Sequence, residues 1–178
     1  MSLHADAVGV MAGWSAPDRE QESLRRAYLA HLDAHPDAML RECRPDHLTA
    51  SAIIVTEDRR HVLLTLHRKL RRWLQTGGHC EPADERLAAA AAREGVEESG
   101  IDDLRVDPEP VLLSHHEVPC GPIRPAHHLD VQFVAYAPGD ARPVISDESV
   151  DVRWFRADDL PASADTSVRT LVDHALRR

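Results

Sequence analysis

Residues 84–101 have the sequence DERLAAAAAREGVEESGI, which predicts a helix at the centre of the fold. The alanine run over residues 88–92 has the strongest intrinsic preference for helix of any residue type. Gly100 stands where a glycine commonly ends a helix. We therefore expect a helix from about residue 84 to residue 99.

Three acidic residues, Glu94, Glu97 and Glu98, lie in the last turns of this helix. Their i, i+3, i+4 spacing places them on one face, where like charges repel and the helix dipole disfavours anions. Each effect costs from some tenths of a kcal/mol to about 1 kcal/mol. A bound hard divalent cation would remove both penalties, and oxygen ligands without clustered thiols favour Mg²⁺ or Mn²⁺ over zinc. The alternative is a solvated acidic face that Arg93 partly neutralises.

The composition is that of an acidic globular protein. The 178 residues are 43% hydrophobic and carry a formal net charge of −9, which argues against a nucleic-acid partner. The longest stretch without acidic or basic residues, residues 7–17, is too short to cross a membrane. Three cysteines without metal-site spacing or a secretory segment indicate a reducing compartment, so we expect a cytoplasmic location.

Arg68, in the basic stretch 67–72, is either a contact for an anionic ligand or part of a solvated turn.

The chain is expected to divide into a helical N-terminal extension, residues 1–45, and a main domain, residues 46–178. An apolar helical period begins after Pro17-Asp18 and ends at His35-Pro36, where proline stops a helix. A second short helix is expected around residues 39–40. The apolar stripe of the extension is too small to form a core alone, so we expect it to pack on the main domain.

The main domain combines strands with two helices. Apolar stretches on either side of a charged turn predict a β-hairpin over residues 50–66. Further strands are expected over residues 111–118, 129–137 and 150–155, and a closing helix over residues 163–176. Strands around a central helix indicate the α/β class with a mixed sheet.

Two glycines precede the central helix. Gly77 and Gly78 are expected to form a tight loop that a ligand or metal can approach closely. From Gly78 to Ile101 the sequence GHCEPADERLAAAAAREGVEESGI resembles the signature of the Nudix hydrolase family. That signature is Gly, five residues, Glu, seven residues, Arg-Glu, an apolar residue, any residue, Glu-Glu, any residue, Gly and an apolar residue. The chain matches its second half in register, from Arg93 to Ile101.

The sequence departs from this signature at two places that affect the site. The interval from Gly78 to Arg93 is one residue longer than the family's, so the upstream acid is either Asp84, at the family's distance from Gly78, or Glu85, at the family's distance from Arg93. Gly95 stands where the family usually has a bulky or apolar residue. A glycine inside a helix costs about 1 kcal/mol relative to alanine, and we expect it to weaken the packing of the helix.

The resemblance implies an α/β/α sandwich that hydrolyses the pyrophosphate of a nucleoside diphosphate linked to another moiety, with Mg²⁺ or Mn²⁺ as cofactor. It implies Glu94 and Glu98 as metal ligands, and Glu97 as a third ligand or as the base that takes a proton from water. Arg93 would orient these carboxylates through an ion pair, and we place it with Glu94 and Glu97 in the catalytic set. Glu148 is either a further metal ligand or a solvated loop acid.

The residues that contact substrate are predicted on the strand expected at residues 129–137 and directly before it. His128 and Asp130 alternate with apolar residues, so one polar face of this strand is available to contact substrate. A zinc site of histidine and acidic side chains is the alternative, although the usual ligand spacing is absent.

The expected partner is a small nucleoside diphosphate derivative. Neither a nucleic acid nor a membrane is expected as a partner. The chain is compatible with either a monomer or a homodimer. A catalytically weak Nudix-like domain that binds or senses a nucleotide or sugar is the alternative function, and a family isomerase is a third. The retained acidic cluster favours catalysis, because a binding domain has little use for mutually repelling charges.

Overall fold

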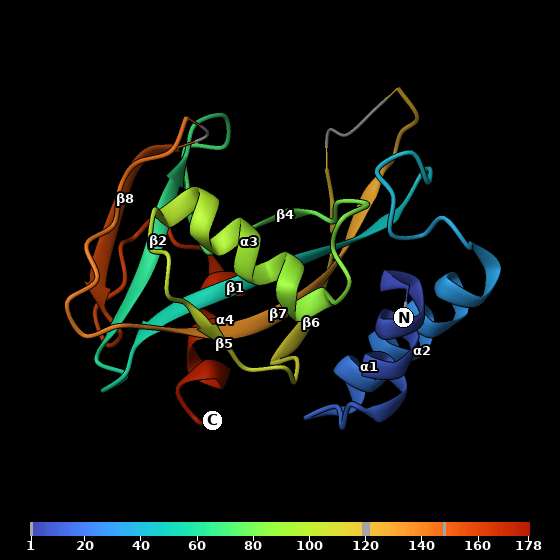
Figure 1. Cartoon of the computed structure of the whole chain (residues 1–178), viewed down its shortest axis with the longest axis horizontal. Coiled ribbons are helices and arrows are strands. Elements are labelled where there is room, and N and C mark those ends of the chain that lie inside the picture. Colours follow the sequence, from blue (N-terminus) through green and yellow to red (C-terminus); the bar gives the residue numbers. More distant parts are fainter. Residues whose placement is uncertain (1, 119–121, 148) are drawn as a thin grey trace.

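The computed structural model describes residues 2–118, 122–147 and 149–178. Within these residues, four helices surround a mixed sheet of eight strands (Figure 1). The helices are α1 (Leu3–Gly13), α2 (Arg19–Ala34), α3 (Leu87–Ser99) and α4 (Thr166–Ala175). The strands are β1 (His47–Thr56), β2 (His61–His67), β3 (Trp73–Leu74), β4 (Thr76–His79), β5 (Arg105–Val106), β6 (Leu112–Glu117), β7 (His127–Ala137) and β8 (Ser149–Arg156).

The central strand of the sheet is β1. It pairs in parallel with β7 over its whole length, from His47 opposite His128 to Thr56 opposite Ala137. Its other edge pairs antiparallel with β4 and then with β2. Strand β7 also pairs with β5 and β6, and β2 also pairs with β3 and β8, all antiparallel. The parallel pair among antiparallel pairs makes the sheet mixed, as the sequence predicts.

The side chains of β1 point alternately into two hydrophobic cores. Ala50, Ala52 and Ile54 belong to the core that includes residues of α3. Ile53 and Val55 belong to the core that includes residues of α4. Figure 1 shows α3 in front of the sheet and α4 behind it. The period-two alternation of a strand therefore builds an α/β/α sandwich, and the fold expected from the sequence is confirmed.

The central helix α3 lies close to the sheet. It ends at Gly100, whose left-handed conformation, with φ of 67°, confirms the predicted helix stop. A Cβ atom at Gly95 would lie 2.9 Å from Cδ1 of Leu104 and 3.8 Å from Cδ1 of Ile54. The expectation that Gly95 weakens the packing is wrong, because Leu104 fills the space that a larger residue would occupy.

The N-terminal helices α1 and α2 lie side by side at one end of the sheet (Figure 1). Met11, Trp14, Tyr28 and Leu32 are buried in the same core as the residues beneath α3. The extension therefore shares the core of the main domain.

The extension also covers a strand edge. The side chain of Gln21 donates to the carbonyl oxygen of Leu113 at 3.0 Å and accepts from its N–H at 2.7 Å. The hydroxyl of Tyr28 donates to the carbonyl oxygen of Ser114 at 2.9 Å. The two bonds from Gln21 occupy both backbone groups of Leu113, so α2 covers the edge of β6 at this residue.

Three local features differ from the expectations. Gly77 and Gly78 do not form a loop; they lie in β4, opposite Ser51 and Ala50 of β1. The short helix expected around residues 39–40 is a series of turns instead. Helix α1 is not predicted, because its residues, mostly alanine, glycine and valine, show no clear apolar period.

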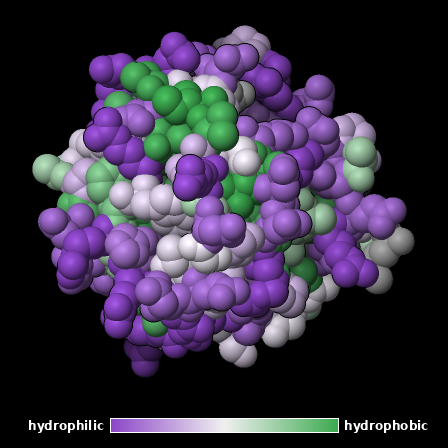
Figure 2. Space-filling model, turned by 60° about the vertical axis from the view of Figure 1, so that its left-hand side comes forward, coloured by the Kyte–Doolittle hydropathy of each residue, from purple (hydrophilic) through white to green (hydrophobic). Residues whose placement is uncertain are grey.

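Hydrophilic residues predominate on the face shown in Figure 2, although a hydrophobic patch lies near its upper edge. None of the helices in the described ranges is long and apolar enough to cross a membrane. The buried residues are mostly hydrophobic, so the acidic residues that give the chain its net charge of −9 lie mainly outside the core.

Candidate active site

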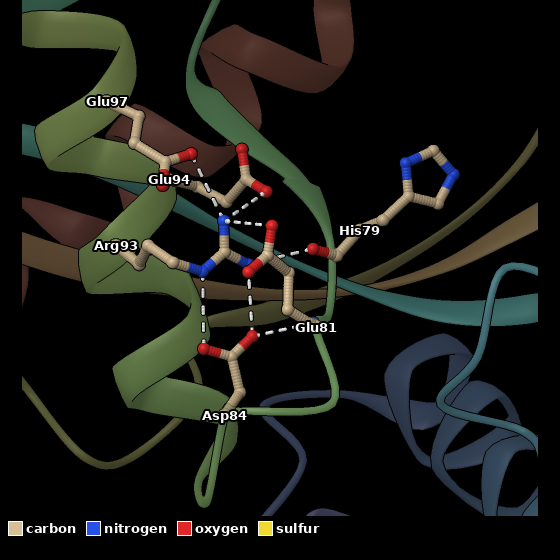
Figure 3. Close-up of polar contacts among 6 residues, drawn as sticks. All are labelled: His79, Glu81, Asp84, Arg93, Glu94 and Glu97. Carbon is tan, nitrogen blue, oxygen red and sulfur yellow. Dashed lines mark hydrogen bonds and ion pairs between the residues drawn. The ribbon is translucent and has the colours of Figure 1, made fainter.

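Arg93 of α3 donates hydrogen bonds to three acidic side chains and forms a longer ion pair, at 3.9 Å, with a fourth, Glu81 (Figure 3). Its Nε and Nη2 donate to the two carboxylate oxygens of Asp84 at 3.2 and 3.0 Å. Its Nη1 donates to Glu94 at 3.0 Å and to Glu97 at 3.1 Å. Nη2 also donates to the carbonyl oxygen of His79 at 2.9 Å. The hydrogen bonds to Asp84 are the main cause that raises the pKa of Arg93, which therefore stays charged.

The network separates the two candidates for the upstream acid. Asp84 binds Arg93 through both oxygens, and its side chain is only 8% exposed. It also accepts from the N–H of Glu81 at 2.8 Å, which fixes the turn before α3. Glu85 is exposed to solvent. The acid beside Arg93 is therefore Asp84, at the position that the spacing from Gly78 predicts.

The glycines of β4 allow close packing on both sides of this strand. A Cβ atom at Gly78 would lie 2.7 Å from Oε2 of Glu94. At Gly77, where φ is 154°, a Cβ atom would lie 2.3 Å from Cβ of Ser51. Glycine is the residue that fits both positions without displacing a neighbour. The backbone of β4 consequently lies directly against an acid of α3.

A cleft of about 330 Å³ opens next to β4. Glu98 of α3 lines it and accepts a hydrogen bond from Oγ1 of Thr65 at 3.3 Å. The other polar or charged side chains that line the cleft are Arg41, Thr49, Ser51, His67, Lys69, Gln75, Thr76, His79, His116, His128 and Asp130. A small-molecule pocket typically measures about 300–1,000 Å³, so the cleft is large enough for part of a nucleotide.

Asp130 of β7 is a buried acid in the wall of this cleft, with 4% exposure. Its carboxylate accepts from Oγ1 of Thr49 at 3.0 Å, from Oγ of Ser51 at 2.6 Å and from Nε2 of Gln132 at 3.2 Å. Hydrogen bonds to a charged acceptor are stronger than neutral ones. These donors fix the orientation of Asp130 and link the adjacent strands β1 and β7 in the wall of the cleft.

The model of the NUDIX domain matches residues 45–175. The chain belongs to the Nudix family. The matched residues begin after α2, so α1 and α2 lie outside the Nudix domain that the family model describes. No curated protein sequence matches the chain significantly.

Solved structures share the Nudix fold. A hydrolase of the Nudix family from Clostridium perfringens is 23% identical, with a TM-score of 0.62 over 74% of this chain and 96% of that chain. The dihydroneopterin triphosphate pyrophosphohydrolase of E. coli is 20% identical, with a TM-score of 0.62 over 75% and 96%. The NUDIX domain of Shewanella oneidensis NrtR, complexed with ADP ribose, is 19% identical, with a TM-score of 0.58 over 73% and 86%. At these identities the likeness shows the fold.

The structure places the three acids of the Nudix signature in different surroundings. The side chain of Glu94 is 14% exposed and lies against β4, whereas that of Glu97 is 55% exposed. Glu98 lies towards β2 and the cleft. Among the described residues, the groups whose ligand atoms lie within 4.8 Å of one another do not include these three acids together. Arg93 instead joins two of them.

The residues present fit a hard divalent cation. The donors that α3 supplies are carboxylate oxygens, which Mg²⁺ and Mn²⁺ prefer. The carboxylate of Glu94 occupies the space that a Cβ atom at residue 78 would fill, so glycine lets this oxygen donor lie directly against β4. Glu98 reaches the adjoining cleft. Glu94 itself is not among the residues that line the cleft.

The remaining predicted residues lie in three situations. His128 and Asp130 both line the cleft. Arg68 is not among the residues lining the cleft; it donates to the carbonyl oxygens of Asp147 at 3.1 Å and Ser149 at 3.0 Å. Glu148 lies outside the described residues.

Sequence reasoning missed several polar residues of the cleft, chiefly Thr49 and Ser51 of β1. Both bond Asp130, and both alternate with buried alanines in a strand whose remaining central residues are apolar. That alternation was present in the sequence and would have indicated a polar position facing the cleft. His79 was not predicted because its neighbours on β1 and β7 are far away in the chain.

Proposed function

We propose that this protein hydrolyses the pyrophosphate of a nucleoside diphosphate linked to another moiety, in a reaction that requires Mg²⁺ or Mn²⁺. The observation that supports this most is the position of Glu98, which extends from the acidic end of α3 into a cleft of about 330 Å³. Acids alone would repel a pyrophosphate, so a cation between them is needed for such a substrate to bind here.

Glu94 and Glu98 would hold the cation. They lie one helical turn apart, one against the glycines of β4 and the other in the cleft. A bound Mg²⁺ would supply charge neutralisation for the pyrophosphate oxygens and would lower the pKa of a bound water. Glu97 either contributes a third ligand or takes the proton from the attacking water, and its exposed side chain is compatible with both roles.

Arg93 would act as a positioning residue. Its guanidinium is bound on one side by the Asp84 carboxylate and the His79 carbonyl oxygen, and on the other side it donates to Glu94 and Glu97. Arg93 is 21% exposed and is not among the residues that line the cleft, so its role would be to hold the carboxylates and not to contact substrate. It fixes these acids and reduces the repulsion between them.

The substrate would bind in the cleft beside Glu98. His128 and Asp130 line it, as do the cationic side chains of Arg41 and Lys69. Opposite charges in one cleft suit a ligand with a negative pyrophosphate and a polar sugar or base. Arg68 follows β2 directly, and this position in the chain is the only support for its proposed role as a contact for an anionic substrate.

The first test is a hydrolysis assay with purified protein. We expect cleavage of at least one compound in a panel of nucleoside diphosphate sugars, dinucleotides and related pyrophosphates with Mg²⁺ or Mn²⁺, and none with EDTA. Inorganic pyrophosphate serves as the control for unspecific hydrolysis. Tight binding of one compound without cation-dependent cleavage would favour the sensor function instead.

Location and assembly remain proposals as well. The described cysteines, Cys43 and Cys80, are buried free thiols, which supports the predicted reducing, cytoplasmic location. A homodimer stays open, and sedimentation of the purified chain at several concentrations would determine its state.

A further inference from the structure

Three imidazoles from three strands converge beside the cleft, and two of them, His79 and His128, line it. His47 and His128 are direct partners in the parallel β1–β7 pair, and His79 of β4 is opposite Thr49, two residues after His47. The three side chains therefore lie on one face of the sheet. The ring centroids of His47 and His79 are 5.1 Å apart, and each lies 4.9 Å from that of His128. One nitrogen of each ring lies within 4.8 Å of those of the other two.

Two of these rings have buried nitrogens without a partner. Nε2 of His47 and Nε2 of His128 make no hydrogen bond to any atom that the structure describes. His47 is 2% exposed, and its Nδ1 lies 3.2 Å from the carbonyl oxygen of Cys43. Since a carbonyl oxygen only accepts, Nδ1 bears the proton and Nε2 has a lone pair directed into the protein. A backbone carbonyl on the far nitrogen is the usual support of a metal-binding histidine.

The rings are neutral, as metal ligands must be. Burial, followed by the neighbouring His47 and the charge of Arg41, lowers the pKa of His79 to about 4. Burial, followed by His79 and His47, lowers the pKa of His128 to about 3. Burial also lowers the pKa of His47. Protonated rings would bind a phosphate directly, whereas neutral rings with inward lone pairs are suited to a soft or borderline cation.

The other groups of candidate ligands differ from this one. In the group of Asp46, His115 and His127, Asp46 already bonds both the N–H and Nδ1 of His127 at 2.9 Å, and His115 is exposed. The group of His35, Asp37 and Cys43 contains a thiol whose pKa burial raises to about 11, so it stays protonated near neutral pH. Neither group has a buried histidine nitrogen that lacks a partner.

We propose that His47, His79 and His128 bind one transition-metal ion, with Zn²⁺ as the best fit, at a site separate from the acids of α3. Three histidines with an open fourth position are a known ligand set for zinc, and imidazole nitrogen is not a preferred ligand of Mg²⁺. Tetrahedral zinc with bonds of about 2.0–2.1 Å needs the three nitrogens about 3.4 Å apart, which modest rotations of the half-buried His79 and His128 rings provide.

The open position of the ion faces the cleft, because His79 and His128 both line it. Figure 3 shows the imidazole of His79 pointing away from Arg93, while its carbonyl oxygen accepts from the guanidinium at 2.9 Å. The same residue thus takes part in both sites through different atoms. A ligand in the cleft would therefore be within reach of both the zinc ion and Glu98, which lines the same cleft.

The test is metal binding to chelator-treated, folded protein, independent of any activity. Zinc binding is measured by competition with a chromophoric chelator in excess Mg²⁺, which occupies carboxylate sites. We expect one Zn²⁺ per chain. His79→Gln and His128→Gln should each weaken zinc binding by about 100-fold or more, since even a lost supporting contact costs 10–100-fold. The variants His35→Gln and His115→Gln, which disrupt the other two groups, should bind zinc as the wild type does.

Co²⁺ in the wild-type protein gives a second readout that needs no variant. Nitrogen ligation in a four-coordinate site produces strong visible absorption, and one equivalent of Zn²⁺ should abolish it. Glu98→Gln should keep both zinc binding and this spectrum, so failure of the proposed hydrolase would leave the zinc site intact. No zinc binding in excess Mg²⁺, a weak octahedral Co²⁺ spectrum, or unchanged affinity in both histidine variants would contradict the proposal.

Discussion

The guanidinium of Arg93 explains how acidic residues accumulate at the negative end of α3. Like charges at i, i+4 and the helix dipole both disfavour Glu94 and Glu98. Arg93 donates to Glu94 and Glu97, and Asp84 holds it in place from below. The network therefore depends mainly on the carboxylate of Asp84, because the other acid on this side of Arg93, Glu81, is 58% exposed and lies 3.9 Å from the guanidinium.

Replacement of Asp84 tests this dependence. Asp84→Asn removes the charge from an ion pair that is 8% exposed on one side and 21% exposed on the other. Hydrogen bonds to charged groups contribute about 1.5–3 kcal/mol, so we expect the free energy of unfolding to fall by about that amount in urea titrations. Glu85→Gln, one residue away and exposed, is the control and should change it by less than about 0.5 kcal/mol. If Glu85→Gln lowered the free energy of unfolding more than Asp84→Asn, the assignment of the Arg93 ion pair to Asp84 would be wrong.

At this scale the sequence predicted the residue types but not every partner. The acids of α3 were recognised from their helical spacing and the glycine pair from its turn preference, and the family signature then placed Arg93 beside the acids. Asp84 and Glu85 remained equivalent, because one inserted residue can be accommodated at either end of a turn. Gly95 was misjudged, because the side chain that compensates for it, Leu104, lies outside the helix.

Helix α3 receives its N-terminal cap from another element. Its own N-cap residue, Arg86, makes no side-chain capping bond. The N–H of Leu87 donates instead to Oδ2 of Asp6, in α1, at 2.9 Å. An acid at this end is favoured both as acceptor and by the helix dipole. The extension thereby stabilises the helix that bears the proposed catalytic residues.

Loss of this cap should destabilise the whole chain. Asp6→Ala removes the acceptor for Leu87, and loss of a capping side chain costs about 0.5–2 kcal/mol. We expect a lower melting temperature in calorimetry, whereas Asp33→Ala, at an exposed position of α2, should melt like the wild type. Equal melting of the Asp6 variant and the wild type would show that solvent replaces the cap without cost.

Elements with a strong period or stop signal were predicted, and short elements were not. The hairpin of β1 and β2, the strand β7 and the helices α2 to α4 are confirmed. Strand β4 was taken for a loop, because glycines in sequence do not reveal that β1 pairs with them. Helix α1 lacks an apolar period and is fixed by tertiary contacts such as the Asp6 cap.

At the scale of the whole molecule, the extension and the Nudix domain form one core. Met11, Trp14, Tyr28 and Leu32 are at most 5% exposed. Burial of one such side chain contributes about 1.5–3 kcal/mol, and a domain is stable by only about 5–15 kcal/mol. The four side chains together are therefore comparable to the entire margin of stability.

Removal of residues 1–44 should consequently prevent stable folding, although the family model begins at residue 45. The shortened chain would expose this apolar surface and the edge of β6 that Gln21 covers. We expect it to aggregate or to melt without a cooperative transition, while the full chain unfolds in one transition. A shortened chain with an unchanged melting temperature would establish the extension as an independent appendage.

The meeting of distant residues could not be predicted from the sequence. The grouping of His47, His79 and His128 depends on the registers of β1 with β4 and with β7, which no local period reveals. The same registers bring Thr49 and Ser51 to Asp130. The signature in the sequence identifies the acidic helix. The cleft beside this helix is formed by residues that only the pairing of β1 with β4 and β7 brings together.

The measurement that tests the central claim most directly is the turnover of Glu98→Gln, with the substrate that the panel identifies and saturating Mg²⁺. The amide keeps the shape and can still accept from Thr65, but it is a weaker ligand for a hard cation. Glu57→Gln, in the turn after β1, is the control. We predict that Glu98→Gln lowers turnover by about 100-fold or more at an unchanged or slightly higher melting temperature without metal, because one repulsive charge is removed. Turnover close to that of the control would contradict the account and exclude Glu98 from the active site.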